Sequence, residues 1–548
     1  MKKIIGILSI LMMCSSAVFG QKQGVYYSKK AQTGYKVPEW TQTRHLLPAP
    51  VYEQNPLWVE TYYKAWELAF RNFYAPTEAS GFISLFADAA FCENIFLWDT
   101  SFITMFCNYA DGLVPGICSL DNFYAKQHES GEICREINRR NGKDFTPWVN
   151  EKHEPLFSRW GYNIAEKLEK TFISYIGREA PDRASTNTLD AMDHPILAWA
   201  EVESYKVTGN KERLMNVYEP LKQYYYALQR YIRQGNGLYM TDWASMDNST
   251  RNIHLKGGGT GIDISSEMAL FAKNLAYIAT VAGKKSEAAT FKKEAKQLIS
   301  AINRQMWSEQ QGFYYDLRLD GSQVGIKTVA GFWPLLAEVA DKKQAAQLVR
   351  QLENPHTFAT QNLVPTLSAD EQGFSENGNY WCGSVWAPTT TMVIMGLENY
   401  GYSALAEKIA INHIALVANV FASTGTIWEN YSPNKEDHGY LADGGNVVRD
   451  FVGWSGIAPI KLFLEYGIGL RPDAPQNTLN WILAGNSKTG CRNYRFNSNL
   501  VSLIAEQGAV SKQIEIDSEK PFVLVVKKGN SVEKFQIKKG HQMINMSK

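Results

Sequence analysis

The sequence predicts an all-α (α/α)6 toroid followed by a small C-terminal antiparallel β module, and three observations lead to this fold class. From about Asn55 to Leu470, apolar residues recur at helical spacing, as in VETYYKAWELAFRNF and SEMALFAKNLAYIATVAG. Many of these segments end at a glycine, the residue that closes helices in the left-handed conformation. The stops recur about every 65 residues, which divides the region into about six helical hairpins. They are Gly209, Gly283, Gly401 and Gly467.

The third observation is a change of texture after Pro475. TLNWILA, NLVSLIAE, KQIEIDS, FVLVVKK and VEKFQIKK are rich in β-formers and are separated by turn residues. Ahead of the helices, a segment containing Pro38, Pro48 and Pro50 is expected to be extended along the surface. We therefore predict a signal peptide at 1–20, an extended segment at 21–56, the helical domain at 57–472 and the β module at 473–548.

Composition excludes several classes of protein. The chain has 548 residues, 45% hydrophobic and 20% charged, which excludes disorder and collagen. With 56 Lys and Arg against 55 Asp and Glu, it lacks the basic field of a nucleic-acid-binding protein. Its 15 Trp, 28 Tyr and 25 Phe supply flat amphipathic surface of the kind that binds sugars, although a large core uses the same residues.

The first twenty residues have the layout of a cleaved secretory signal. Two lysines precede the apolar run IIGILSILMMCSSAVFG, which ends on small residues. No later window offers the 18 or so apolar residues of a membrane span, so we expect a periplasmic or secreted protein. Met13 ahead of Cys14 argues against a lipoprotein site. The six remaining cysteines allow one or two disulfides and show no zinc-binding spacing.

Two loops carry carboxylates among aromatic residues. Asp247 lies in DWASMDNSTR and can serve as a general acid if apolar neighbours raise its pKa. Glu429 lies in GTIWENYSP, 182 positions further on, so only a closed fold can bring the two together. An inverting glycosidase needs such a pair about 6.5–9.5 Å apart. By composition alone, an Asp in a turn is more often a cap or a turn former.

Six ordered motifs then carry a family resemblance over roughly residues 57–470: FLWDTSF, GEICRE, SMDNSTR, YWCGSVWAP, WENYSP and FVGWS. In this order they resemble the six-hairpin glycosidases of the clan that unites glycoside hydrolase family 63 with the family 37 trehalases. The resemblance implies inverting hydrolysis of an α-glycosidic bond, with Asp247 as acid and Glu429 as base. It also implies that Trp98 and Asp99 hold the sugar in the cleaved subsite, with Arg135 nearby.

The chain departs from the family pattern at two motifs. The Gly that usually precedes the MDNS-type segment is absent, since Ser245 directly precedes Met246. Where the family usually has YWRGPVW, Cys382 replaces the Arg and Ser384 the Pro. Loss of a guanidinium removes a hydrogen-bonding fork near the pocket and leaves the identity of the sugar open.

Further residues are predicted to bind substrate, each with a structural alternative. Tryptophans can stack on pyranose faces or fill the core. We expect His194 and His254 to be structural, Asp263 to cap a helix, and Glu376 to rank below Glu429 as a second acidic candidate. The predicted substrate contacts beyond those already named are Asn187, Trp243, Arg251, Trp381, Trp386, Trp428 and Trp454.

The sequence therefore predicts an exported inverting α-glycosidase that removes a terminal α-linked sugar from an oligosaccharide or glycoside. A glucoside is the first choice, with mannosides and galactosides behind it. A non-catalytic glycan-binding protein on the same toroid is the first alternative, and a polysaccharide lyase the second. No cofactor, metal ion or nucleic-acid partner is expected.

Overall fold

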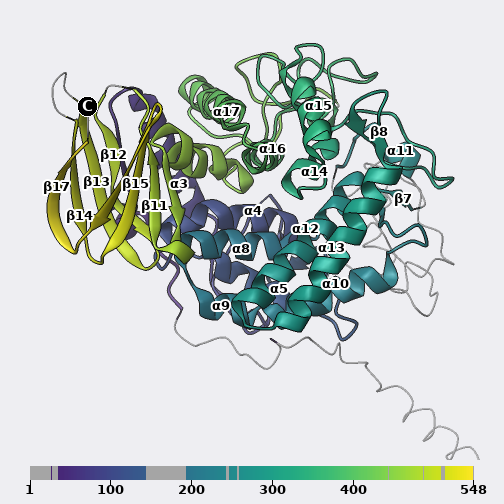
Figure 1. Ribbon diagram of the computed structural model, residues 1–548, viewed down its shortest axis with the longest axis horizontal. Helices are drawn as coiled ribbons and strands as arrows, with labels where there is room; N and C mark the ends of the chain where they lie inside the picture. The colour runs from purple at the N-terminus through teal and green to yellow at the C-terminus, as the bar shows by residue number, and fades with distance from the viewer. Residues whose placement is uncertain are drawn as a thin grey trace, which may run out of the picture.

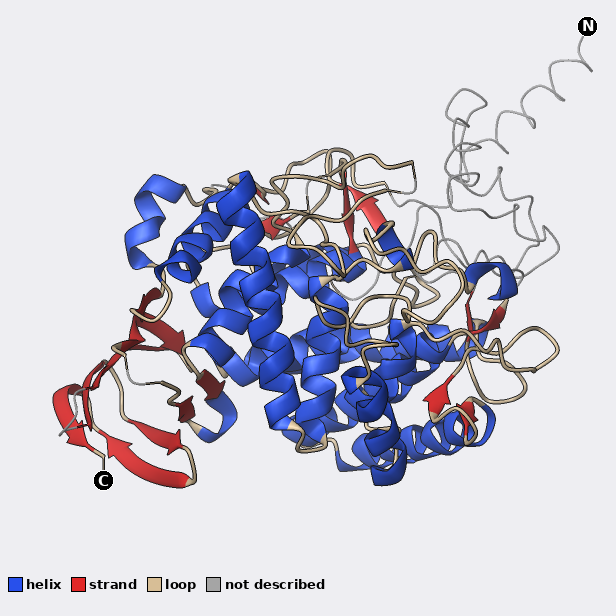
Figure 2. Ribbon diagram, turned by 90° about the horizontal axis from the view of Figure 1, so that it is seen from above, coloured by secondary structure: helices blue, strands red, loops and turns tan. Residues whose placement is uncertain are grey.

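The chain folds into a helical domain with a β module at one end (Figure 1). The computed structural model describes residues 26, 35–89, 91–143, 193–241, 246–255, 258–441, 443–485, 487–507 and 512–546. Figure 2 shows the strands of the module beside the helices, and long loops gathered over the part of the helical domain away from it. The prediction of a helical domain followed by β structure is confirmed.

Six helical segments form a closed succession of contacts. Each packs on the next, from α4 through α8, α12, α14 and α16 to η8, and η8 returns to pack on α4. All eleven residues of α4 are buried, as expected for a helix that is surrounded by others. The segments are α4 (Leu97–Cys107), α8 (Leu197–Thr208), α12 (Ile262–Val281), α14 (Trp333–Leu336), α16 (Ala387–Asn399) and η8 (Trp454–Ile457).

A second set of helices packs outside this succession. α13 lies on α12, α17 on α16, and α3 on both α17 and η9, which continues η8 with wider helical turns. α13 shows why these helices lie outside: apolar residues such as Phe291 and Leu298 are buried, whereas its lysines face solvent. The larger outer helices are α3 (Pro56–Phe70), α10 (Tyr218–Tyr231), α13 (Lys285–Gln305), α15 (Lys342–Glu353), α17 (Ser403–Thr424) and η9 (Ala458–Gly467).

Three of the four predicted glycine stops are confirmed. Gly209, Gly283 and Gly401 have φ angles of 69°, 76° and 79°, the left-handed region that ends a helix. At the fourth, η9 ends at Gly467 as predicted, but the left-handed residue is Gly469, with φ 92°. The helical pattern over 331–352 also proves to be two helices, because Asp341 starts α15 with a capping box to Gln344.

α17 is the one helix among the described residues that is long and apolar enough to cross a membrane. It packs against α16, α3 and η9, and 56% of its most apolar window is buried inside the protein. These contacts make α17 part of the helical domain.

The β module contains two sheets. The five-stranded sheet has the order β1-β12-β13-β14-β17 and the four-stranded sheet the order β10-β11-β15-β16. The prediction of a purely antiparallel module is wrong in one place, because β11 and β15 pair in parallel. The strands are β10 (Leu470–Asp473), β11 (Thr478–Ile482), β12 (Thr489–Phe496), β13 (Asn499–Gln507), β14 (Lys512–Ser518), β15 (Phe522–Lys528), β16 (Ser531–Ile537) and β17 (Gly540–Asn545).

The N-terminal segment is part of the β module as well. Its strand β1 (Ala49–Tyr52) pairs antiparallel with β12, so the chain begins its described fold in the sheet in which it ends. Next to this strand, the Tyr62 hydroxyl of α3 donates to the Pro48 carbonyl at 2.6 Å. The segment therefore links the module to the first large helix.

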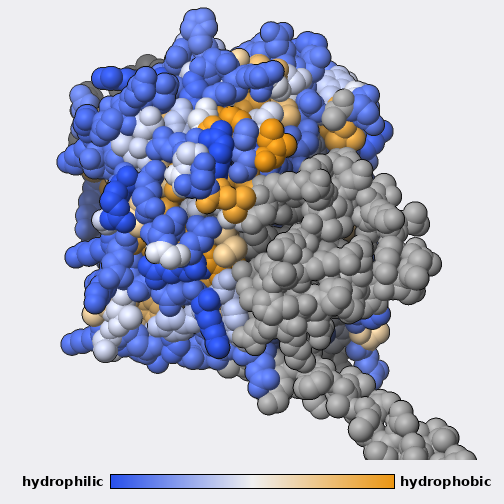
Figure 3. Space-filling view, turned by 90° about the vertical axis from the view of Figure 1, so that its right-hand side faces the viewer, coloured by the Kyte–Doolittle hydropathy of each residue, from blue (hydrophilic) through white to orange (hydrophobic). Residues whose placement is uncertain are grey.

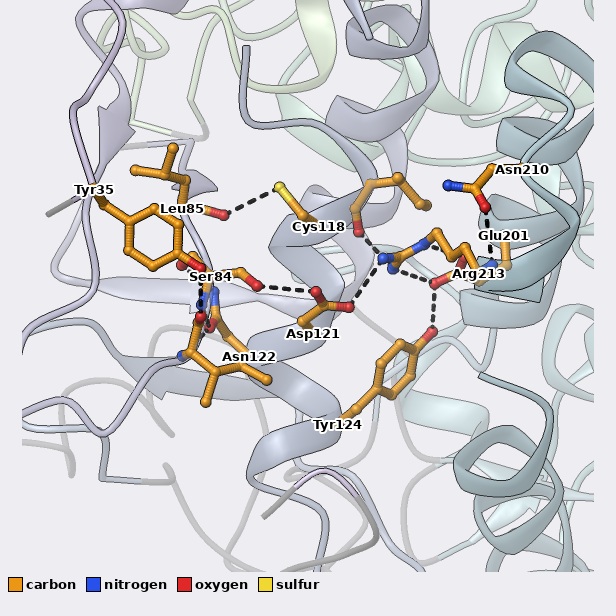
Figure 4. A network of polar contacts seen from close by, with 12 residues as sticks. Tyr35, Ser84, Leu85, Cys118, Asp121, Asn122, Tyr124, Glu201, Asn210 and Arg213 are labelled. Atoms are coloured by element: carbon orange, nitrogen blue, oxygen red, sulfur yellow. Dashed lines mark hydrogen bonds and ion pairs between the residues drawn. The ribbon is translucent and has the colours of Figure 1, made fainter. Parts of the chain in front are cut away.

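A buried polar network links α8 to two shorter helices (Figure 4). Arg213 of α9 (Lys211–Asn216) is paired with Glu201 of α8 at 2.7 Å and with Asp121 of α5 (Asp121–Ala125) at 3.0 Å. The Tyr124 hydroxyl donates to the same glutamate at 3.0 Å. Because both carboxylates are paired, their burial beside the arginine is compensated.

The described surface includes exposed apolar side chains on the side of α11 (Asn252–Leu255), which Figure 3 views. Ile253 is 73% exposed. Single exposed apolar groups of this kind are normal on a protein surface. The six described cysteines form no disulfide with one another, so the one or two disulfides that the sequence allows are not made.

Candidate active site

A cavity of about 300 Å³ opens where several helices of the closed succession begin. Trp98 and Asp99 lie in the first turn of α4, Trp386 immediately precedes α16, and Trp454 starts η8. Helix N-termini present free backbone N–H groups and favour negative charge. A pocket at this end of the ring therefore suits acidic side chains.

A short β ladder brings two motifs together at the cavity. β4 (Asn94–Phe96) pairs with β5 (Glu136–Asn138), and the Leu97 amide donates to the Arg135 carbonyl at 2.9 Å. Arg135, 2% exposed, lines the cavity and contacts Glu136 at 2.5 Å. The ladder thus explains why FLWDTSF and GEICRE, distant in the sequence, meet at one site.

Four indole rings form one wall of the cavity. Trp381 and Trp386 stack at 4.3 Å between ring centroids. Trp454 lies 5.6 Å from both Trp386 and Trp98. All four tryptophans line the cavity, as predicted for these positions, and they leave flat apolar faces of the kind that stack on sugar rings.

Asp247 and Glu429 line the same cavity. Asp247 is half-buried, and the Asn252 amide donates to the backbone carbonyls of Met246 and Asp247 at 2.8 and 3.1 Å. This side chain holds the loop in place from α11. The fold therefore brings together two carboxylates that lie 182 positions apart in the sequence.

Glu429 is 5% exposed and both of its oxygens accept hydrogen bonds. The Tyr380 hydroxyl donates to Oε1 at 2.8 Å and the Val448 amide to Oε2 at 3.2 Å. Burial raises the pKa of Glu429 to about 7, against the opposing effect of these two donors. A carboxylate with such a pKa loses its proton near neutral pH and can then accept one from water.

Two further carboxylates lie at the cavity. Burial raises the pKa of Asp99 well above its usual range, and the neighbouring Asp193 adds to the shift. Asp99 Oδ1 and Trp98 Nε1 are buried and have no hydrogen-bond partner among the described residues. Unsatisfied buried polar atoms in a cavity are the atoms that a ligand hydroxyl would satisfy.

Three predicted site residues lie elsewhere. Arg251 is 0% exposed and pairs with Asp263 and with Asp316 at 3.2 Å. These ion pairs anchor the end of the acid loop, the loop 242–251 that carries Asp247. Arg251 therefore does not line the cavity. Trp428 is also absent from the cavity wall, because its ring stacks on His438 at 4.0 Å. Glu376 is exposed on the surface.

Other predictions have separate outcomes. Asn187 and Trp243 lie outside the described residues. His194 has the structural role expected, because its ring contacts the Glu267 carboxylate at 2.6 Å. Burial lowers the pKa of His194, but this carboxylate outweighs burial and raises the pKa to about 9. Asp263 pairs with Arg251 rather than serving as the cap, since Gly261 occupies that position of α12.

Sequence reasoning missed several residues of the cavity, two of which, Asp193 and Tyr380, bind other residues of the site; the others are Phe91, Phe96, Leu441, Asn446, Val447 and Val448. Asp193 accepts the amides of Trp98 at 3.2 Å and His194 at 2.8 Å, and so fixes the start of α4. The signal for Tyr380 was its place at the head of the YWCGSVWAP motif. Asp193 carried no comparable signal, because it meets Trp98 only when the closed succession of helices forms.

Within the described part of the chain, one group of three side chains offers ligand atoms within 4.8 Å of one another. Glu515 and Asp517 of β14 and His541 of β17 form it, on the surface of the β module and apart from the cavity. Such exposed acidic groups are common without an ion. They carry no assignment here.

The model of the mannosylglycerate hydrolase MGH1-like glycoside hydrolase domain matches residues 98–451. The chain belongs to this family. It is therefore a glycoside hydrolase, and the resemblance to family 63 is confirmed. The matched region begins at Trp98 and ends just beyond Glu429, so it contains both carboxylates.

The chain is also similar to two bacterial proteins. An uncharacterized protein of Borreliella burgdorferi is 28% identical over 449 residues, 81% of this chain and 86% of that protein. A mannosylglycerate hydrolase of Rubrobacter radiotolerans is 30% identical over 141 residues, which cover 25% of this chain and 31% of that enzyme.

Among solved structures, a family 63 mannosylglycerate hydrolase from Thermus thermophilus in complex with glucose has a TM-score of 0.53 at 18% identity. The match covers 73% of this chain and 98% of that one. At this identity the likeness concerns the fold alone.

Proposed function

We propose that this glycoside hydrolase is an inverting α-glycosidase, with Asp247 as general acid and Glu429 as general base, on a helical domain of (α/α)6 type. The observation that carries the proposal is that both carboxylates line one cavity with four tryptophans. Asp247 protonates the leaving oxygen, while Glu429 takes a proton from the water that attacks the opposite face of the sugar.

The acidic surroundings suit this reaction. Asp193 joins the two catalytic candidates at the cavity, and Arg135 is the cation that lines it among the described residues. An oxocarbenium-like transition state carries positive charge, which carboxylates stabilise. The same surroundings argue against a polysaccharide lyase, whose uronic acid substrate would need cations.

The substrate is proposed to be the end of a short α-glycoside, a glucoside before a mannoside or galactoside. A cavity of about 300 Å³ lies at the lower end of the range for small-molecule sites, which favours removal of a terminal sugar. The name of the Rubrobacter radiotolerans relative makes mannosylglycerate one compound to assay. We also propose export to the periplasm or medium, which N-terminal sequencing of the mature protein tests.

Paired substitutions test the two roles. Asp247→Asn and Glu429→Gln each remove a proton donor or acceptor with little change of shape, and we expect each to lower kcat by about 10²-fold or more. Thermal unfolding should show that both variants remain folded. If either variant keeps more than a few per cent of wild-type kcat, that role belongs to another residue, and Asp99 and Asp193 are the next to substitute.

A glycan-binding protein without catalysis is the second candidate, and the same assay separates it. The wild-type protein would then bind glycosides in calorimetry and release no sugar.

A further inference from the structure

The segment Asn379–Cys382 forms a turn with an uncommon backbone. Asn379 and Tyr380 have φ angles of 51° and 59°, two successive non-glycine residues in the left-handed region. Asn tolerates this region, but a bulky residue such as Tyr adopts it only at an energetic cost. Surrounding contacts must therefore hold the turn in this conformation.

Several hydrogen bonds do so on the backbone of Tyr380. Its amide donates to the Tyr440 carbonyl at 2.9 Å, and its carbonyl accepts from the Ser384 amide at 3.1 Å and from the Trp386 indole at 3.4 Å. Strained residues fixed by their surroundings in this way concentrate at functional sites. The turn is therefore a rigid part of the cavity wall.

The turn holds the acid loop through Asn248, the residue after Asp247. Asn248 Oδ1 accepts from the Trp381 amide at 2.9 Å, and its Nδ2 donates to the Asn379 carbonyl at 3.1 Å. The Cys382 thiol donates to the Asn248 carbonyl at 3.2 Å. Three contacts to three residues of one turn leave Asn248 little freedom to shift.

The same turn contacts the base loop, the loop 425–433 that carries Glu429. The Tyr380 hydroxyl donates to Glu429 Oε1 at 2.8 Å. Three residues past the turn, Val385 and Tyr431 exchange backbone hydrogen bonds of 2.8 and 3.0 Å, which ties this chain segment to the base loop just past Glu429. Within seven residues the chain therefore contacts both catalytic loops.

We propose that the turn Asn379–Cys382 sets the separation between Asp247 and Glu429, with Asn248 and Tyr380 as its positioning residues on the acid and base sides. The proposal rests on the proposed function for its kinetic consequences. An inverting reaction needs a defined gap for one water molecule between the base and the sugar. A displacement of about 1 Å in a catalytic group can cost about 10²-fold in rate.

Two variants address the two sides of the turn. Asn248→Ala removes all side-chain hydrogen bonds to the turn, and we expect kcat to fall about 10- to 100-fold with KM changed less than about threefold. Tyr380→Phe removes the donor to Glu429, and we expect the acid limb of the pH profile of kcat to move to higher pH, because this hydrogen bond lowers the pKa of Glu429. A merely structural role would change stability and leave the pH profile in place.

Asn377→Ala is the matched control. Asn377 is two residues before the turn, exposed, and accepts from Lys435 at 2.6 Å. We expect its kcat and pH profile to equal those of the wild type. Asn248→Asp, which keeps the acceptor for Trp381 and loses the donor to Asn379, replaces Asn248→Ala if that variant fails to fold, with the same expected fall in kcat.

Crystal structures of the wild-type, Asn248→Ala and Tyr380→Phe proteins measure the distance between the Asp247 and Glu429 carboxyl groups without reference to any reaction. We expect a change in this distance in Asn248→Ala. An unchanged distance with wild-type kcat overturns the proposal. Full activity of Asp247→Asn or Glu429→Gln would instead overturn the proposed function, so the two failures are distinguishable.

Discussion

At the scale of the residue, Glu429 illustrates how function conflicts with stability. The side chain is 5% exposed, and burial raises its pKa to about 7 from an ordinary value of 4.5. The folded protein therefore binds a proton more tightly at this group than the unfolded chain does. It follows that the free energy of unfolding falls as the pH rises from about 4.5 to about 7, and that the loss is complete above that range.

The variant Glu429→Gln should reverse this effect. At pH 8 the glutamine carries no buried charge, so we expect the variant to be more stable than the wild type by up to about 3 kcal/mol, and near equal at pH 4. Urea unfolding at the two pH values measures the difference. Equal stability at pH 8 would mean that the cavity solvates the carboxylate and that its pKa is ordinary.

The sequence predicted site residues correctly where they lie in a recognisable motif. Asp247, Glu429, Trp98, Trp381 and Trp386 all line the cavity. Reasoning failed where a side chain has two plausible partners: an arginine in a loop can face a sugar or two buried aspartates, and only the packing of α12 decides that Arg251 does the latter.

At the scale of the element, helix ends were predicted well where glycine conformation determines them. Gly209, Gly283 and Gly401 end their helices as the sequence indicates. η9 also ends at Gly467, but there the left-handed residue comes two positions later, at Gly469. The strands β1, β12 and β17 had no clear alternating pattern, so their place in a sheet follows from pairing rather than from propensity.

Gly469→Ala tests the turn that replaces the predicted one. Gly469 has φ 92°, and an added Cβ would collide with the carbonyl oxygen of Ile482. We expect a loss of stability of more than about 2 kcal/mol, measured by urea unfolding.

Gly401→Ala is the matched control for this substitution. Gly401 has φ 79° but open space around its Cα, so alanine should cost about 1 kcal/mol. If the two variants were equally stable, the close approach of β11 to Gly469 would not contribute to the free energy of unfolding.

At the scale of the whole molecule, the chain closes on itself twice. The helices α4 and η8 close the succession of inner helices, and β1 closes the β module onto the start of the fold. Periodicity indicated the first closure through its count of hairpins. It could not indicate the second, because a four-residue strand far from its partner leaves no pattern in the sequence.

Removal of residues 1–55 tests the second closure. The deletion leaves an edge of β12 unpaired and removes the carbonyl that Tyr62 binds. Exposed edge strands promote association, so we expect a lower melting temperature and aggregation, measured by calorimetry and light scattering. A chain lacking only residues 1–20 serves as the control and should behave as the mature protein. A monomeric 1–55 deletion with an unchanged melting temperature would show that β1 contributes nothing to the fold.

The central claim is that Asp247 and Glu429 invert an α-glycosidic bond. Proton NMR of the sugar first released from a panel of α-glucosides, α-mannosides, α-galactosides, trehalose and mannosylglycerate tests it most directly. The mechanism predicts that the attacked sugar appears first as the β-anomer and then mutarotates; from trehalose, whose leaving group is itself an α-glucose, one β- and one α-glucose appear together. Release of the α-anomer first would contradict it, because a retaining reaction needs a nucleophile within about 5.5 Å of the acid instead of a water held by Glu429.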